Sequence, residues 1–443
     1  MLENAINKVT GSMKPTKYRF VALFMILAVM TLSTGDRAAI SIAGIGMQTQ
    51  LHISKTGMGV LMSAFSWAYV FGQLPAGWLG DKIGSKKCML IGIVFWSLAT
   101  LVMGFSGWIY ISFTILIILR VLLGVFETPV GPGSGRIIAS WFPSSERGVA
   151  GSIFNSGQYL SLVIFTPFMG WLAFAHGWPW VYIAMGVIGL VMAFAWQKFF
   201  YVPKRHPKVN KAELDYISQG GGLIDLDSNL KTSTKEKFSF KDIGKLFKSR
   251  MLVGIFISQY CINAITYFYL TWFPTYLVTQ RGFSILKAGI VASLPAICGC
   301  IGGISSGFIS DFILKRTKNL SIARKIPITI GLLLSSSIIL CNYVSTNTIV
   351  IFLMSLAFFG KGFGSLGWTV IADTAPKKIL GITGGVFNGL GNLAGIVTPV
   401  IIGMILDKTG SFNGALIYVG AHAIVAVLSY WVIVGKIERL EIA

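Results

Sequence analysis

Residues 56–87, the stretch that decides the fold, read TGMGVLMSAFSWAYVFGQLPAGWLGDKIGSKK. The first part, 56–80, contains no Asp, Glu, Lys or Arg, and a membrane-spanning helix needs about 20 mostly apolar residues. Asp81, Lys82, Lys86 and Lys87 follow it directly. The stretch therefore predicts a helix that crosses a membrane and ends in a basic loop.

The rest of the chain has the same character. Hydrophobic residues make up 54% of the 443 residues, charged residues only 12%, and the mean hydropathy is +0.72. These values lie far outside the range of soluble domains, so we expect an all-α integral membrane protein. The charge-free stretches and their breaks predict twelve spanning helices, at 18–46, 56–79, 86–106, 108–131, 146–172, 178–201, 250–279, 287–311, 325–343, 348–371, 379–406 and 412–435.

The net charge of +21 raises the question of a nucleic-acid partner. The basic residues form no single patch, however, and recur in alternate loops. With the amino terminus in the cytoplasm, the outer loops hold only Lys55, Arg281, Lys287 and Lys408. This is the positive-inside asymmetry of membrane proteins. We therefore expect both termini in the cytoplasm, lipid around the helices and no nucleic-acid partner.

A polar interval at 203–249 separates six predicted helices from six. We expect helical bundles at 18–202 and 250–435, a cytoplasmic linker at 203–249, and cytoplasmic ends at 1–17 and 436–443. Within the linker, 211–219 and 239–249 predict short surface helices, whereas Gly220-Gly221-Gly222 and the polar run after it indicate flexibility.

The two predicted bundles share a sequence pattern. Pro143 and Asn155 recur as Pro376 and Asn388, each 233 positions later, with glycines conserved in register between them. Six helices lie between the copies, so each copy crosses the membrane in the same direction. The pattern therefore predicts parallel repeats, an organisation common among transporters.

The loop after the second predicted helix carries regularly placed glycines and charges. A basic cytoplasmic loop explains its lysines but not the spacing of Gly77, Asp81 and Gly84. Glycines allow helix ends to approach, and Asp81 can pair with a helix amino terminus or a basic side chain in one conformation and release it in another. We interpret this segment, repeated in the second half, as a gating motif made of Gly77, Asp81, Gly84, Lys86, Lys87 and Asp311.

A few ionisable residues fall inside predicted spans, where each costs about 2.5–3.5 kcal/mol and is by default a functional candidate. Asp36 and Arg37 lie on the first helix, and Arg120 and Glu127 lie two turns apart on one face of the fourth. The alternative is a structural ion pair that joins these two helices. For Lys361, on the tenth helix, packing or snorkelling is as good an interpretation as function.

Polar and aromatic side chains at similar depth predict a cavity between the bundles. Singly they are weak evidence, because such side chains are often packing contacts worth about 0.6 kcal/mol. Their helix positions allow them to converge near the midplane with the charged residues. The set comprises Tyr69, Gln73, Asn155, Gln158, Ser365, Trp368, Asn388 and Asn392.

Other chemistry finds little support. The five cysteines lie in or at the ends of predicted helices, the four histidines lack metal-ligand spacing, and there is no phosphate-binding loop. We therefore expect no metal and no cofactor other than protons as a coupling ion. The sequence shows no clustered nucleophile, which argues against an enzyme, and no sizeable cytoplasmic output domain, which argues against a sensor. A secondary transporter remains the favoured interpretation.

Several motifs resemble the major facilitator superfamily, beginning with the Gly77–Lys87 loop. Nearly end to end, the sequence is similar to the anion:cation symporter branch and most of all to bacterial glucarate/galactarate permeases. The resemblance rests on SAFSWAY at 63–69, RVLLGVFE at 120–127, WFPSSERG at 141–148, IFNSGQY at 153–159, TWFP at 271–274, AFFGKGFGSLGW at 357–368 and DTAP at 373–376.

The resemblance implies proton-coupled uptake of a sugar acid across the bacterial inner membrane by a monomer of the major facilitator fold. It implies that Arg37 grips a carboxylate, that Asp36 and Glu127 carry protons and that Arg120 tunes their charge. The implied contacts to the rest of the substrate are Tyr69, Gln158, Ser365, Trp368 and Asn388. Galactonate, gluconate or a hexuronate remains an alternative substrate, and a facilitator or an organic-anion exchanger remains an alternative mode.

Overall fold

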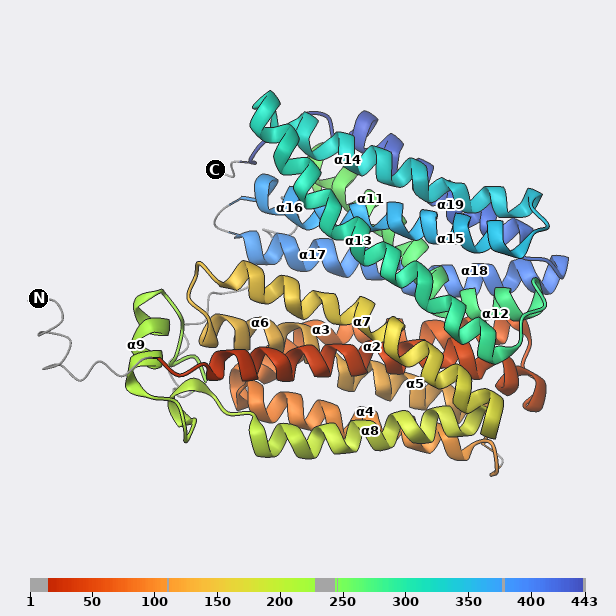
Figure 1. Cartoon of the computed structure of the whole chain (residues 1–443), viewed down its shortest axis with the longest axis horizontal. Helices are drawn as coiled ribbons and strands as arrows, with labels where there is room; N and C mark the ends of the chain where they lie inside the picture. Colours follow the sequence, from red (N-terminus) through yellow and green to blue (C-terminus); the bar gives the residue numbers. More distant parts are fainter. Residues whose placement is uncertain (1–14, 110, 228–243, 245, 377–378, 441–443) are drawn as a thin grey trace, which may run out of the picture.

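The computed structural model describes residues 15–109, 111–227, 244, 246–376 and 379–440, and these are almost entirely helical. The chain forms two bundles of roughly parallel helices, one from each half of the sequence (Figure 1). The first bundle contains α2 (Tyr18–Gln50), α3 (Lys55–Ile83), α4 (Ser85–Phe105), α5 (Phe113–Glu127), α6 (Val130–Trp141), α7 (Arg147–His176) and α8 (Trp178–Phe199).

A short connecting segment follows, with η1 (Pro203–Arg205) and α9 (Lys211–Gln219). In Figure 1, α9 lies at the left end of the molecule; we call this the linker end and the opposite one the far end. The second bundle contains α11 (Arg250–Thr271), α12 (Phe273–Thr279), α13 (Ile285–Thr317), α14 (Leu320–Ser335), η2 (Ser336–Tyr343), α15 (Asn347–Gly362), η3 (Phe363–Ser365), α16 (Leu366–Thr374), α17 (Leu380–Asn392), α18 (Ala394–Thr409), α19 (Asn413–Leu428) and η5 (Ser429–Ile433).

Among the described residues, eleven helical stretches are long and apolar enough to cross a membrane. The 29-residue helix α3 supplies the twelfth long helix. Consecutive elements such as α5 and α6, or α17 and α18, are two parts of one span. The molecule is therefore all-α with twelve spanning helices, as the sequence predicts.

Two predicted boundaries differ most from the structure. The fourth span does not end at 131, because α6 continues it to Trp141 beyond Pro129. A proline removes only its own hydrogen bond and fits at the start of a new helical turn. The glycine-rich segment 131–135, which we expected after the helix, therefore lies inside it. Likewise α13 runs to Thr317, past the predicted end at 311, because charged residues stop a span in the bilayer but do not stop a helix.

Several helices begin at a side chain that accepts a hydrogen bond from a backbone N–H of the first turn. Ser54, Ser112 and Ser284 do this at the starts of α3, α5 and α13, all at the far end. Such caps satisfy donors that otherwise lack a partner within the helix. These polar caps fix the residues at which the apolar helices α3, α5 and α13 begin.

The two bundles pack tightly at the far end. A Cβ on Gly59 of α3 would collide with the Pro399 carbonyl of α18, and a Cβ on Gly403 would collide with Lys55. From α18, the Asp407 carboxylate accepts hydrogen bonds from the backbone N–H groups of Lys55 (2.9 Å) and Thr56 (2.7 Å). This carboxylate covers the amino terminus of α3, where negative charge is stabilised, and helps to close the far end.

Candidate functional site

Four of the charged residues predicted inside the membrane, Asp36, Arg37, Arg120 and Glu127, meet in the first bundle, between α2 and α5. The Arg37 Nε donates to Glu127 Oε2 at 2.7 Å. The Glu127 side chain is fully buried, whereas that of Arg37 keeps 13% of its surface exposed. Their positions are fixed partly by Gly124, since a Cβ there would collide with the Phe65 carbonyl of α3. The sequence-predicted convergence of helices 1 and 4 is therefore present.

Asp36 and Arg120 lie beside this pair and are also buried. Asp36 is electrostatically coupled to Glu127 and Arg120 and faces the indole of Trp96. Among the described residues, the Trp96 indole is the one donor that faces the Asp36 carboxylate, outside ideal hydrogen-bond geometry, and Glu127 Oε1 has no partner. The Nη1 of Arg120 and the Nη2 of Arg37 are likewise unpartnered. Buried charged groups are normally fully paired. The unpartnered atoms of this cluster can therefore accept protons or bind a ligand.

Aromatic rings of α3 form the wall behind the two guanidinium groups. The Arg37 Cζ lies 4.3 Å from the Tyr69 ring centroid and 5.0 Å from that of Phe65. The Arg120 Cζ lies 5.6 Å from the Phe65 ring. Stacking on aromatic faces holds a guanidinium in a fixed plane. Tyr69, predicted as a substrate contact, therefore lies directly beside Arg37.

Polar contacts continue from this wall into the second bundle. The Tyr267 hydroxyl of α11 donates to Asn392 Oδ1 at 3.0 Å, and Asn392 Nδ2 donates to Asn388 Oδ1 at 3.1 Å. Asn388 in turn donates to Gln73 of α3 at 3.4 Å. Tyr267 also lies near Arg37 of the first bundle. Asn388 is thus placed where the two bundles meet.

Sequence reasoning missed Tyr267. It belongs to an aromatic run, Tyr267-Phe268-Tyr269, and such runs usually pack in a helical bundle core. What distinguishes Tyr267 is that its ring lies where α11, α18 and α3 meet. A Cβ on Gly395 of α18 would collide with both the Tyr267 ring and the Ser66 hydroxyl of α3. A single sequence carries no signal for that arrangement.

The remaining predicted substrate contacts make no hydrogen bond with the charge cluster in the part of the chain that the structure describes. Ser365 and Trp368 are exposed, with the Ser365 hydroxyl 3.4 Å from that of Ser306 and the Trp368 ring edge-on to Phe387 at 5.0 Å. Gln158 of α7 is exposed. Within the described chain, no hydrogen bond joins Ser365, Trp368 or Gln158 to Arg37. The structure brings only part of the predicted site into contact.

Helix α7 shows where water reaches the space between the bundles. One of its faces is apolar and exposed, as expected toward lipid, with Val149, Ile153, Leu160 and Ile164. The opposite face carries the exposed amides of Asn155 and Gln158. Exposing amides to hydrocarbon is costly, so we infer that this second face borders a polar cleft between the bundles and not lipid.

The cleft opens toward the linker end. A Cβ on Gly148 or Gly151, on the polar face of α7, would meet no atom within 4 Å. Farther along the same face, a Cβ on Gly170 would lie 3.0 Å from the Gly289 Cα of α13. Between these levels, Tyr159 packs edge-on against Phe358 of the second bundle at 6.5 Å. The same stripe of α7 is therefore open at the linker end and closed at the far end.

The predicted gating residues lie at the linker end. Arg136 of α6 forms ion pairs with Asp81 and, at 2.8 Å, with Asp227. The Asp227 carboxylate also accepts hydrogen bonds from the backbone N–H and hydroxyl of Ser85 at the start of α4. In the second half, Arg324 is paired similarly, with Asp373 at 2.9 Å and Asp311 at 3.6 Å. Both repeats therefore place an arginine between two carboxylates.

The other residues of the motif have separate contacts. Gly84 has φ +84°, a conformation that favours glycine. Lys86 donates to the Gln197 carbonyl at 3.0 Å, and Lys87 is exposed. A Cβ on Gly77 would meet nothing within 4 Å, so the close approach that we expected from this glycine does not occur in the present conformation.

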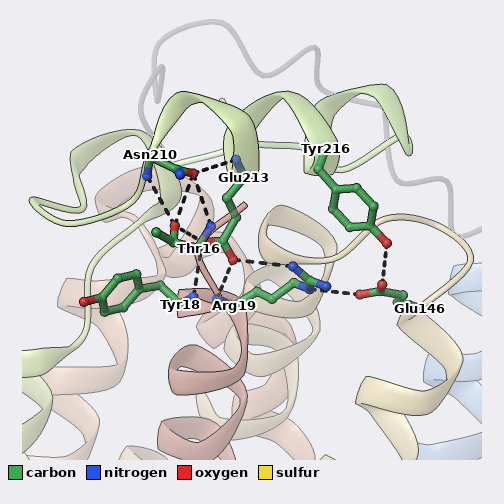
Figure 2. A network of polar contacts seen from close by, with 7 residues as sticks. All are labelled: Thr16, Tyr18, Arg19, Glu146, Asn210, Glu213 and Tyr216. Atoms are coloured by element: carbon green, nitrogen blue, oxygen red, sulfur yellow. Dashed lines mark hydrogen bonds and ion pairs between the residues drawn. The ribbon is translucent and has the colours of Figure 1, made fainter. Parts of the chain in front are cut away.

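Helix α9 is fastened to the start of α2 by a network around Glu213 (Figure 2). The Glu213 carboxylate accepts hydrogen bonds from the Thr16 hydroxyl and from the backbone N–H groups of Tyr18 (3.2 Å) and Arg19 (3.1 Å). Arg19 also pairs with Glu146 at 3.1 Å, and Glu146 accepts from the Tyr216 hydroxyl at 2.6 Å. The predicted helix at 211–219 is present and docked.

Gly220-Gly221-Gly222, predicted to be flexible, lie in a segment that is hydrogen-bonded to the first bundle. The Ser144 N–H donates to the Gly220 carbonyl at 2.8 Å, and the Leu223 N–H donates to that of Ala139 at 2.9 Å. Gly221 has φ +81°, so these glycines make a turn that returns the chain to the bundle. Residues 228–243, and most of the second predicted linker helix, lie outside the described residues.

Residues 25–399 match the family model described as Major Facilitator Superfamily. The match covers most of the chain and coincides with the two bundles. The chain belongs to the Major Facilitator Superfamily.

Curated relatives narrow the comparison within the superfamily. A probable galactarate/D-glucarate transporter of Escherichia coli is 53% identical over 97% of this chain and 96% of its own length. One of Bacillus subtilis with the same description is 52% identical, over 98% and 95%. A D-galactonate transporter of Escherichia coli is 38% identical, over 96% and 98%. The relatives are transporters, which places this superfamily member outside the enzymes.

Among solved structures, a bacterial homologue of the human lysosomal transporter Spinster, in an inward-facing and occupied conformation, superposes with a TM-score of 0.73. The two chains share 17% sequence identity, and the match covers 94% of this chain and 97% of the other. This similarity shows the fold: a multi-pass membrane protein of the major facilitator type.

Proposed function

We propose that the protein takes up a sugar acid together with protons, and that its substrates are the dicarboxylates glucarate and galactarate. The observation that carries the proposal is the buried Arg37–Glu127 pair next to Asp36, whose carboxylate faces no donor in the described chain other than the Trp96 indole. Such a cluster provides both an anion-binding group and acceptors for protons. The named substrates of the most similar relatives supply the chemical class.

Competition for Arg37 supplies a coupling mechanism. A guanidinium binds a carboxylate through two parallel hydrogen bonds, but in the present structure Glu127 occupies the Nε of Arg37. Protonation of Glu127 removes the charge that holds it there and releases the guanidinium for a substrate carboxylate. Substrate and proton then enter the site together, and Arg120 limits the charge imbalance around Asp36.

Charge balance favours this coupling. Moving a dianion into an inside-negative cell costs about 2.3 kcal/mol per charge per 100 mV, or about 4.6 kcal/mol in all. Two protons carried with it cancel that cost. Asp36 and Glu127 are two buried carboxylates in one cluster, which matches that number of protons.

The cleft between the bundles gives the remaining residues their roles. Tyr69 and Asn388 border the charge cluster, whereas Gln158, Ser365 and Trp368 are exposed. We propose that all five contact the polyol chain of the substrate once the bundles close around it. The Asp81 and Asp311 ion pairs at the linker end then rearrange as that end closes.

We also propose that the protein lies in the bacterial inner membrane as a monomer, with both termini and the linker in the cytoplasm. The basic residues near the linker end support this orientation through the positive-inside rule. The present conformation is then inward-facing. Cysteines introduced at exposed linker positions are expected to resist impermeant thiol reagents in intact cells, and labelling from outside would overturn the orientation.

An uptake panel in proteoliposomes tests the substrate and the coupling mode. Labelled glucarate, galactarate, galactonate and glucuronate are offered with and without an inward proton gradient. We expect glucarate and galactarate to accumulate only with the gradient. A preference for galactonate or glucuronate would show that one of these is the substrate instead. Uptake that is the same with and without the proton gradient would favour a facilitator or an exchanger.

A further inference from the structure

Lys361 lies on α15, where the second bundle faces the first. Its neighbours Gly360 and Gly362 are packed against α14 and α13, since a Cβ on either would collide with the carbonyl of Gly331 or of Gly299. The lysine lies between these two contacts. Its Nζ is 5.6 Å from the ring centroid of Tyr159, on α7 of the first bundle, and 5.1 Å from that of Phe358.

The Lys361 ammonium has no carboxylate within ion-pair distance in the described part of the chain. In contrast, Arg37 and Arg324, on other spanning helices, each contact a carboxylate. A charge at membrane depth is costly without a partner, and two aromatic rings stabilise it only in part. The site therefore lacks a negative charge that a ligand can provide.

The direction of the helix face agrees with a ligand-binding role. Ser365 and Trp368 follow Lys361 by four and seven residues, with the 3-10 turn η3 between α15 and α16, so the three side chains lie toward one side of the stretch and not on a strict α-helical stripe. Both are exposed. Ser365 Oγ would lie 3.7 Å from a Cβ on Gly303, and the Tyr159 hydroxyl 4.0 Å from the same point. Lys361, Ser365 and Tyr159 therefore meet at one place between the bundles.

We propose that Lys361 binds the second carboxylate of the dicarboxylate substrate, while Arg37 binds the first; this inference rests on the function proposed above. Each bundle then supplies one cation, on α2 and on α15, and a molecule with an acid group at both ends bridges them. A sugar acid with a single carboxylate leaves Lys361 unpaired. Lys361 therefore determines the preference for dicarboxylates over monocarboxylates.

The test compares Lys361→Gln with wild type in proteoliposomes, using uptake of glucarate and galactarate and competition by galactonate and gluconate. We expect uptake of the two dicarboxylates to fall about tenfold or more, because a charge-assisted hydrogen bond is lost. The apparent affinity for the monocarboxylates is expected to change little. Lys361→Arg, which keeps the charge, is expected to restore most dicarboxylate uptake.

Lys325 provides a matched control. It is also a largely buried lysine on a spanning helix, with its Nζ 5.3 Å from the Trp431 ring, but it lies on α14 with ring contacts inside the second bundle. Lys325→Gln is expected to leave the ratio of dicarboxylate to monocarboxylate affinity unchanged.

Two results would overturn the inference: equal losses for all four acids in Lys361→Gln, which indicate a packing role, or no loss for any of them. If Lys361→Gln does not fold, Lys361→Met, with an unbranched chain of similar length, makes the same comparison. Failure of the wild-type protein to transport any dicarboxylate would instead refute the proposed function, so the two failures are distinguishable.

Discussion

Glu213 at the linker end and Glu127 between the membrane helices are both fully buried carboxylates beside an arginine, yet their surroundings differ. Glu213 accepts hydrogen bonds from a hydroxyl and two backbone N–H groups in addition to its ion pair with Arg19. Glu127 has one contact, with Arg37, and its Oε1 has no partner in the described chain. We call Glu213 saturated, because its carboxylate has its full set of hydrogen-bond partners, and Glu127 and Asp36 unsaturated, because theirs do not. A saturated carboxylate stabilises the fold, whereas an unsaturated one can exchange partners.

The largest expected effect concerns stability at the saturated site. Glu213→Ala leaves the partly buried backbone N–H groups of Tyr18 and Arg19 without their acceptor and removes one of the two carboxylates that pair with Arg19. Breaking one partner of a buried pair costs up to about 3–5 kcal/mol. We expect a clear drop in thermal unfolding temperature in detergent. Glucarate uptake per folded molecule is expected to stay near that of wild type. A selective loss of proton coupling in this variant would remove the distinction between the two carboxylates.

The next effect concerns substrate binding at the unsaturated site. Arg37→Lys keeps the charge but cannot reproduce a planar two-point contact with a carboxylate. We expect glucarate uptake to fall at least about tenfold, with little change in unfolding temperature. Arg19→Lys in the linker-end network is the control and is expected to transport normally. Near-normal affinity in Arg37→Lys would show that this arginine is only a structural counter-ion.

A smaller effect is expected from Trp368, which is half exposed and touches the ring of Phe387 at its edge. Removing an aromatic face that covers the substrate chain typically costs about 1 kcal/mol, or roughly a fivefold rise in KM. Trp368→Ala is therefore expected to bind glucarate more weakly while folding normally. If the variant only reduces the yield of folded protein, Trp368 is a packing residue.

The smallest effect is a pH dependence of stability at the linker end. His206 packs among the rings of Tyr18, Trp141 and Tyr201. Burial lowers its pKa below the ordinary 6.5; the nearby Glu213 carboxylate opposes this shift, and Lys208 and Lys86 add to it. The unfolded chain then binds a proton more readily than the folded one, so stability falls as the pH drops below about 6.5.

Comparing unfolding temperatures at pH 7.5 and 5.5 measures this dependence. His206→Asn is expected to reduce the difference between the two temperatures by a modest amount, with transport at pH 7.5 unchanged. An unchanged difference in the variant would assign the pH dependence to other groups.

Much of the membrane part could be predicted from the sequence, because its rules are local. About 20 apolar residues make a span, and an ionisable residue at that depth needs a partner, which predicted that Arg37 and Glu127 lie in one cluster. The linker could not be predicted, because Glu213 and Asp227 acquire their partners only when the chain folds back on α2 and α4. Tyr267 was missed for a similar reason: its partners Asn392 and Ser66 belong to different helices.

The most direct test of the central claim, that the unsaturated carboxylates carry the coupled protons, is transport by Glu127→Gln in two assays on the same proteoliposomes. Glutamine has the shape of a permanently protonated glutamate and releases Arg37 from its ion pair. We predict that this variant exchanges glucarate across the membrane at equal pH but does not accumulate it under an inward proton gradient. Asp36→Asn is expected to show a defect in the same direction. Glu213→Gln, the control, is expected both to exchange glucarate at equal pH and to accumulate it under the gradient. Accumulation by Glu127→Gln at the wild-type level would contradict the account.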